Sequence, residues 1–258
     1  MAIVVDVTET GTRDQFHLRG AWNFRDVGGL RTTDGRTVAP GILFRSSQLA
    51  GLDDVGRQTL VELGVTEVYD LRGLPEVERA GRDAVPADVT VHNTPFDPDH
   101  DDSAPHDMPA LHTPELVEKY MTGVYAQFAD HDGAHKAIGA VARSIADGDG
   151  TVLVHCAAGK DRAGWLTATL LRAVGVSDED IVADYLRSND AIAPLRAMIG
   201  AKYDDHEMIS DAMLGVSESF YRAGMRAVEE HYDSFDAYLD EVGIDADTRE
   251  RLRRRLLA

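Results

Sequence analysis

The chain has 258 residues, of which 43% are hydrophobic and 28% charged, a composition that excludes collagen-like, coiled-coil and disordered proteins. Its net charge of -19, from 26 Lys and Arg against 45 Asp and Glu, repels nucleic acid and anionic membranes at long range, so nucleic acid is not expected as a partner and an anionic substrate would need local basic groups. No apolar run approaches the roughly 18–20 residues of a transmembrane segment, and the N-terminal segment lacks the pattern of a Sec signal peptide, which predicts a cytoplasmic protein.

The first half of the chain alternates between helical and strand patterns. A helix is predicted over residues 53–64, because two Asp open it and a glycine ends it. Strands are predicted over residues 65–72 and 89–96, the second from its alternating β-branched side chains. The polar stretch 75–88 between them is typical of a short helix and a loop. Residues 97–113 are rich in Asp, His and Pro without periodicity, which predicts a surface loop.

The second half is predicted to be mostly helical around one buried strand. Apolar spacing predicts helices over residues 114–128 and 134–145, and a β-branched run predicts a strand over 151–156. A strongly apolar helix is expected to follow that strand over residues 163–175. Further helices are predicted at residues 177–190, 217–231, 234–241 and 245–257. This order of elements predicts an α/β fold in a single domain, residues 1–258, with a helical C-terminal half.

The sequence contains one cysteine, Cys156, so an intrachain disulfide and a Cys-rich zinc site are both excluded. Cys156 ends the predicted buried strand, and five residues separate it from Arg162, near which a helix begins. Backbone N–H groups of such a loop, at the N-terminus of a helix, bind a tetrahedral oxyanion and also stabilise a thiolate. Cys156 is therefore predicted to be a nucleophile.

The residues around Cys156 have predicted roles that follow from their chemistry. Arg162 is expected to bind two phosphate oxygens at once, a bidentate contact that Lys cannot make. Gly159 permits a tight turn or a positive φ angle. His155 is expected to shape the loop through backbone hydrogen bonds rather than to act as a base. The other positions expected to bind the phosphate are Ala157, Ala158, Lys160, Ala163 and Gly164.

Residues 155–164, HCAAGKDRAG, resemble the H-C-x5-R signature of the cysteine-dependent protein tyrosine phosphatases, and in particular a bacterial branch of that family. Residues 20–30, 41–49, 101–106 and 181–190 resemble segments of the same branch in the same order. The resemblance implies a tyrosine phosphatase-like α/β fold, with a mostly parallel sheet flanked by helices, and a cysteinyl-phosphate mechanism that needs no metal or other cofactor. It implies phosphotyrosine proteins as partners, with phosphoserine, phosphothreonine and phosphoinositides as further substrates. A monomer is expected, and export without a Sec signal stays open.

The resemblance also suggests roles for charged residues near the predicted loop. Lys160 resembles a loop lysine of phosphoinositide phosphatases, which adds positive charge for a multiply phosphorylated ring. The leaving group needs a proton, and the first candidate for the acid is Asp161, whose position is linked to catalysis in this branch. The second candidate is Asp70, for which a helix cap or a pair with Arg72 is the alternative. Arg45 is a candidate second phosphate contact.

Two departures from the branch lead to specific expectations. Ala163 stands where the branch usually has Thr or Ser, a hydroxyl that helps to stabilise the thiolate during breakdown of the phosphocysteine, so this step is expected to be slow. The stretch between Phe96 and Tyr120 is shorter than in the branch, where a helical lid covers the active site, so a reduced lid is predicted.

The acidic and His-rich segments lack the spacing of a calcium-binding loop and of a helical zinc-binding pair, so no metal is expected. A phospho-binding pseudophosphatase and a primarily phosphoinositide phosphatase remain the alternative functions.

Two peripheral segments also have predicted roles. Residues 23–26 are expected to anchor the N-terminal segment near the pocket. The basic C-terminal helix is expected to bind neighbouring acids and helix carbonyl groups rather than a membrane.

Overall fold

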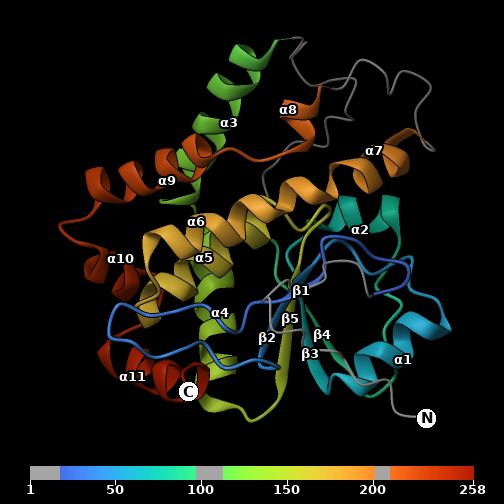
Figure 1. Ribbon diagram of the computed structural model, residues 1–258, viewed down its shortest axis with the longest axis horizontal. Coiled ribbons are helices and arrows are strands. Elements are labelled where there is room, and N and C mark those ends of the chain that lie inside the picture. The colour runs from blue at the N-terminus through green and yellow to red at the C-terminus, as the bar shows by residue number, and fades with distance from the viewer. Residues whose placement is uncertain (1–17, 97–112, 201–209) are drawn as a thin grey trace.

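A computed structural model describes residues 18–96, 113–200 and 210–258. Residues 97–112, which contain most of the predicted surface loop and most of the expected lid segment, lie outside the described residues. The described chain forms a central sheet with helices on both sides (Figure 1). The predicted α/β class is therefore confirmed.

The sheet has five strands in the order β1-β2-β5-β3-β4. The strands are β1 (Arg25–Asp26), β2 (Leu43–Ser46), β3 (Val65–Asp70), β4 (Thr90–Asn93) and β5 (Thr151–His155). Only β1 pairs antiparallel to its neighbour, and the other pairs are parallel, which confirms the mostly parallel sheet. The predicted elements did not include β1 or β2. A two-residue strand has no periodicity, and β2 is buried along its whole length although it contains Arg45, so its side chains do not alternate.

The predicted helices occur in the predicted order, but the one expected over residues 177–190 ends at Leu186, and the helices Ile192–Gly200 and Asp211–Leu214 were not among the predictions. The helices are α1 (Asp54–Glu62), α2 (Leu74–Ala80), α3 (Pro114–Phe128), α4 (Asp132–Asp147), α5 (Arg162–Val174), α6 (Asp178–Leu186), α7 (Ile192–Gly200), α8 (Asp211–Leu214), α9 (Glu218–His231), α10 (Phe235–Glu241) and α11 (Ala246–Leu256), with a 3-10 turn at Arg187–Ala191. Their ends are set by local chemistry. The Ser177 hydroxyl accepts a hydrogen bond from the amide of Asp180 and so caps α6, and Gly175 ends α5 with φ of 95°.

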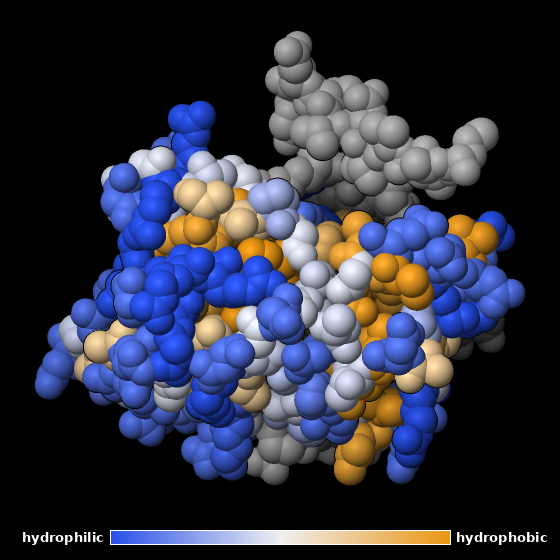
Figure 2. All heavy atoms as spheres, turned by 90° about the horizontal axis from the view of Figure 1, so that it is seen from below, coloured by the Kyte–Doolittle hydropathy of each residue, from blue (hydrophilic) through white to orange (hydrophobic). Residues whose placement is uncertain are grey.

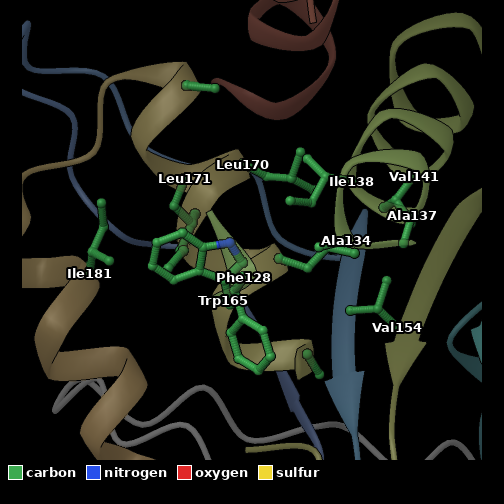
Figure 3. Close-up of a cluster of buried hydrophobic side chains, with 14 of the residues drawn as sticks. Phe128, Ala134, Ala137, Ile138, Val141, Val154, Trp165, Leu170, Leu171 and Ile181 are labelled. Carbon is green, nitrogen blue, oxygen red and sulfur yellow. The ribbon is translucent and has the colours of Figure 1, made fainter. Parts of the chain in front are cut away.

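Both faces of the sheet are covered. On one face Leu153 of β5 packs with Leu60 of α1, and on the other Val152 and Val154 belong to the larger core built with α4 and α5. Figure 3 shows Trp165 of α5 beside Phe128, with Ile138 and Leu170 nearby. A strand that is apolar on both faces produces an uninterrupted hydrophobic run, which is why β5 could be predicted from sequence.

The basic C-terminal helix binds other parts of the fold. In α11, the Arg249 side chain donates to the carbonyl of Ala173 and Arg253 donates to the carbonyl of Val174, so both satisfy the last turn of α5. Arg251 pairs with Asp147 at the end of α4. These contacts confirm the expectation that this helix binds acids and helix carbonyl groups.

Among the described residues, no helix is both long and apolar enough to cross a bilayer. Figure 2 shows one face that is mostly hydrophilic with apolar patches.

The contact of α9 with the core leads to a stability prediction. A β-carbon at Gly224 would lie 2.4 Å from Cζ3 of Trp165 and 3.0 Å from the carbonyl oxygen of Tyr125, whereas one at Gly123 of α3 would meet nothing within 4 Å. Gly224→Ala is therefore expected to lower the free energy of unfolding by about 1–3 kcal/mol. Gly123→Ala, the matched helical control, is expected to raise it by up to about 1 kcal/mol. Urea unfolding measures both, and equal stability of the two variants would contradict the packing.

Candidate active site

Cys156 directly follows β5, the middle strand of the sheet, at the carboxyl edge of the parallel strands. Residues 157–161 connect it to the first residue of α5, Arg162. The Cys156 residue is 3% exposed. Crevices at this edge are where open α/β sheets bind ligands, because strand ends and helix N-termini meet there.

The carbonyl groups of loop residues 157–160 accept hydrogen bonds from other parts of the fold. Three donors make four hydrogen bonds to these carbonyls. Gln48 N donates to Ala157 O at 3.1 Å, Asn23 Nδ2 donates to Ala158 O at 3.2 Å, and Arg45 Nη2 donates to both Gly159 O at 2.7 Å and Lys160 O at 3.2 Å. In a trans peptide the N–H points opposite to the C=O. The amides that follow these carbonyls, those of residues 158–161, therefore point to the other side of the loop, where Cys156 is expected to meet an anion.

Gly159 is required by this turn. Its φ is 70°, and a β-carbon there would lie 2.3 Å from the carbonyl oxygen of Ser46. A side chain at this position would push the loop away from β2, so the predicted positive φ is present and has a steric reason. Ala163 and Gly164 lie in the first turn of α5, both buried, and Gly164 lets the helix approach Arg45 closely.

Arg45 lies behind the loop rather than over the phosphate position. Its side chain is 1% exposed, and besides the two loop carbonyls it contacts Asp184 of α6 at 3.3 Å. Arg25 binds the same carboxylate at 3.0 Å and donates to Asn23 Oδ1 at 2.6 Å. Burial, followed by the charge of Arg25, lowers the pKa of Arg45 to about 10. This geometry argues against the predicted phosphate contact and makes Arg45 a support for the loop, while Asn23 and Arg25 show how residues 23–26 are anchored there.

Arg162 is held by a carboxylate that the sequence did not point to. Its two terminal nitrogens lie 2.6 and 2.8 Å from the two oxygens of Glu76 on α2. Burial alone would raise the pKa of Glu76, but the hydrogen bonds and charge of Arg162 outweigh burial and lower the pKa to about 2. The side chain of Arg162 is 15% exposed. The guanidinium is thus oriented before any substrate arrives.

Asp161 lies in the loop and is held by two donors. Tyr125 donates its hydroxyl to Oδ1 at 2.9 Å, and the Lys160 ammonium lies 3.0 Å from Oδ2. Tyr185 in turn donates to Tyr125 at 2.7 Å. Burial, and next the charge of Asp161, raise the pKa of Tyr125 well above its ordinary value, so its phenol keeps its proton. The Asp161 side chain is 23% exposed and therefore accessible to a leaving group.

Lys160 contacts its own chain rather than open space. Its ammonium donates to the carbonyl oxygens of Met213 at 3.1 Å and Gly215 at 2.9 Å, in addition to the carboxylate of Asp161. These contacts tie the loop to the end of α8. Lys160 could therefore contact a second phosphate only if these bonds exchanged.

Asp70, the second acid candidate, forms a buried pair with Arg72. Both oxygens of Asp70 accept from the Arg72 side chain at 2.8 Å, and the carboxylate is 4% exposed. The sequence analysis gave a pair with Arg72 as the alternative to a catalytic role for Asp70, and the observed pair argues against Asp70 as the acid.

His155 is fully buried, with Nδ1 3.2 Å from the carbonyl oxygen of Cys156, a contact that fits the predicted loop-shaping role. Its Nε2 lies 2.8 Å from Asp83, a residue that the sequence did not single out.

Comparisons with known proteins agree with this geometry. The model of the tyrosine phosphatase family matches residues 16–258. The triple specificity protein phosphatase PtpB of Mycobacterium tuberculosis is 40% identical over an alignment of 275 residues, gaps included, which covers 93% of this chain and 98% of that protein. A candidate tyrosine-protein phosphatase of Cupriavidus necator is 33% identical over 86% of this chain and 82% of its own length. A tyrosine-protein phosphatase of Nostoc commune is 28% identical over 85% and 76%.

Proposed function

The chain belongs to the tyrosine phosphatase family and hydrolyses phosphoesters, and we propose that it does so through a phosphocysteine formed on Cys156. The observation that supports this most strongly is the capture of the loop carbonyls from behind by Gln48, Asn23 and Arg45. Because the N–H of a trans peptide points opposite to its C=O, the amides of residues 158–161 are inferred to face the point where a phosphoryl group would bind. The N-terminus of α5 and the guanidinium of Arg162 add positive charge at the same point.

The proposed reaction has two steps, formation of the phosphocysteine and its hydrolysis. The Cys156 thiolate attacks phosphorus in line, the bond to the leaving oxygen breaks, and Asp161 gives that oxygen a proton. Loop amides and Arg162 hold the three remaining oxygens as their charge changes. A water molecule then gives its proton to Asp161 and attacks the phosphocysteine, which releases phosphate and restores the thiolate.

The substrates are proposed to be broad. The relative from Mycobacterium tuberculosis is named a triple specificity protein phosphatase, and similarity over most of both chains supports more than one class of substrate here. The classes we propose are phosphotyrosine, phosphoserine or phosphothreonine, and phosphoinositides. Phosphotyrosine proteins remain the first expectation, because the Lys160 ammonium is bound to the carbonyls of Met213 and Gly215. The family match over residues 16–258 supports a single catalytic domain, and a monomer is proposed.

Turnover of an aryl phosphate, measured from pH 5 to 8 with a chelator present, tests this function. We expect chelator-resistant hydrolysis and, after rapid acid quench, a phosphorylated peptide containing Cys156. Loss of activity with chelator would contradict the metal-free mechanism. Binding of a phosphotyrosine peptide without any turnover would instead establish a pseudophosphatase.

Ala163 leads to a prediction about the second step. Ala163 is fully buried in the first turn of α5, so a hydroxyl there would lie close to the loop. A hydrogen bond to a charged group contributes about 1.5–3 kcal/mol, so Ala163→Thr is expected to raise kcat by about tenfold or more and to diminish any burst of product. Stopped-flow and steady-state kinetics measure both. Ala163→Val, which has the shape of Thr without the hydroxyl, is the control, and an equal rise in that variant would contradict the explanation.

A further inference from the structure

A buried chain of two phenols ends on the carboxylate of Asp161. Tyr185 of α6 donates its hydroxyl to the hydroxyl oxygen of Tyr125 at 2.7 Å, and Tyr125 of α3 donates to Asp161 Oδ1 at 2.9 Å. Tyr125 and Tyr185 are 0% and 1% exposed, so water does not compete for either hydroxyl. A buried hydroxyl without a partner costs free energy, and this cost favours the one arrangement in which both donate.

The direction of the two hydrogen bonds follows from the acceptor at the end of the chain. An ionised carboxylate only accepts, so Tyr125 donates to Asp161 and accepts from Tyr185. Burial, and next the charge of Asp161, raise the pKa of both phenols well above the ordinary value, so both keep their protons. When Asp161 has a proton on Oδ2, Oδ1 is a carbonyl oxygen and still accepts from Tyr125. The contact therefore persists through both steps of the proposed reaction.

The ring of Tyr125 is fixed by the core around it. Four aromatic rings surround it, with centroids 5.0–6.5 Å from its own, and they belong to Phe128, Trp165, Tyr185 and Phe220. The last three come from α5, α6 and α9, so three other helices pack around this side chain of α3. Such pairs are favourable in edge-on and tilted geometries. The hydroxyl is thus held in place by the ring that carries it.

Asp161 is the N-cap residue of α5, but its side chain does not cap the helix. An Asp in this position commonly accepts a hydrogen bond from an amide of the first helical turn. The carboxylate of Asp161 accepts no such bond from α5, all of which the structure describes, and binds the Tyr125 hydroxyl and the Lys160 ammonium instead. Contacts outside the helix therefore determine where this carboxylate points.

The two oxygens of Asp161 have different surroundings. Oδ1 accepts from the Tyr125 hydroxyl at 2.9 Å and from the Lys160 ammonium at 3.3 Å. The polar contact that the described residues make with Oδ2 is the Lys160 ammonium at 3.0 Å. A carboxylate oxygen has about two lone-pair sites, so Oδ1 is fully used and Oδ2 has a site left for a proton.

We propose that Tyr125, supported by Tyr185, is a positioning residue that holds Oδ1 of Asp161 so that Oδ2 exchanges the proton. Oδ2 gives this proton to the leaving oxygen in the first step and takes one from water in the second. The proposal rests on the proposed role of Asp161 as the acid. It assigns a part in the reaction to α3 and α6, two helices outside the loop.

The leaving group of the substrate provides the test, because an acid contributes most when the leaving oxygen is basic. Tyr125→Phe keeps the ring and removes the hydroxyl. Its kcat/KM is expected to fall about tenfold for phenyl phosphate and by less than about twofold for 2,4-dinitrophenyl phosphate, whose leaving group needs no proton. A residue that only stabilised the fold would affect the two substrates equally. Equal losses for both substrates, or none, would overturn the proposal.

Asp161→Asn separates this inference from the proposed role of the acid. This variant is expected to change the ratio of the two substrates in the same direction and more strongly. Adding Tyr125→Phe to it is expected to change kcat/KM for phenyl phosphate by less than about twofold, because the phenol acts through the carboxylate. A wild-type ratio in Asp161→Asn would refute both the acid and its positioning. A changed ratio in Asp161→Asn, together with a wild-type ratio in Tyr125→Phe, would refute the positioning alone.

Two further variants complete the series. Tyr238→Phe removes another buried phenol, one that accepts from Trp165 Nε1 at 3.3 Å, and it is expected to keep the wild-type ratio. A changed ratio in that control would mean that the effect is not specific to Tyr125, and would overturn the proposal. Tyr185→Phe leaves the bond from Tyr125 to Asp161 in place, so a smaller change of about two- to threefold is expected. If Tyr125→Phe does not fold, a wild-type ratio in folded Tyr185→Phe overturns the proposal.

Discussion

Replacing Cys156 with Ser is expected to lower kcat for an aryl phosphate by at least about 10⁴-fold, the scale on which removing a covalent nucleophile acts. A serine hydroxyl is not ionised by amide dipoles at neutral pH, so no phosphoenzyme forms. The phosphate-binding elements do not involve the sulfur, because the loop carbonyls are held by Gln48, Asn23 and Arg45. Affinity for a phosphotyrosine peptide is therefore expected to remain within a few-fold of the wild type.

Steady-state kinetics and calorimetric titration with a phosphopeptide measure the two expected effects separately. Iodoacetamide offers a matched chemical test, since it modifies the single cysteine of the wild type and cannot modify Cys156→Ser. Inorganic phosphate is expected to protect the wild-type thiol. Substantial turnover by the serine variant, or alkylation that phosphate does not slow, would mean that the sulfur is not at the phosphate site.

The parts of the fold that follow from sequence are those with local causes. Helix α3 begins and ends at the residues its apolar spacing predicted, and β5 was predicted because both of its faces are apolar. The loop after Cys156 was also predicted, because a strand end, a glycine and a helix start are all visible in ten residues. By contrast, β2 contains the buried Arg45, whose charge is compensated by loop carbonyls and by Asp184, over a hundred positions away along the chain. No local pattern reveals that pairing.

The same distinction separates the predicted site residues from those that were missed. Cys156 and Arg162 belong to one short string, whereas Glu76, Asp83 and Tyr125 reach the loop from other elements. In the sequence Glu76 and Asp83 belong to a polar stretch that looks like an ordinary surface helix and loop. The Glu76 carboxylate accepts from the amide of Gly73 at the start of α2, a capping contact whose spacing is visible, but its partner Arg162 is not. Which residues contact each other across the fold depends on tertiary structure. The sequence therefore identifies the reactive side chains, whereas the residues that hold them in place are seen only in the structure.

Replacing Arg162 with Lys is expected to lower kcat/KM by about 10²–10³-fold, because an ammonium cannot make two parallel hydrogen bonds to phosphate. Part of the loss comes from Glu76, which holds both terminal nitrogens of the guanidinium at 2.6 and 2.8 Å. Glu76→Gln keeps the shape of the partner and removes its charge, and a milder loss of about tenfold is expected from a less well oriented Arg162. If Arg162→Lys kept wild-type kcat/KM, the arginine would not contact the phosphate.

The pair of Glu76 with Arg162 makes the stability of the fold depend on pH. The pKa of Glu76 is lowered from its ordinary value of 4.5 to about 2, so its pair with Arg162 contributes stability in full above pH 4.5 and loses it as pH falls toward 2. Between pH 5 and 8 Glu76 stays ionised and cannot produce an acid limb. Glu76→Gln should therefore lower the height of the kcat/KM profile across this range without moving its acid limb to higher pH. An acid limb that moved to higher pH in Glu76→Gln would mean that this carboxylate does more than orient Arg162.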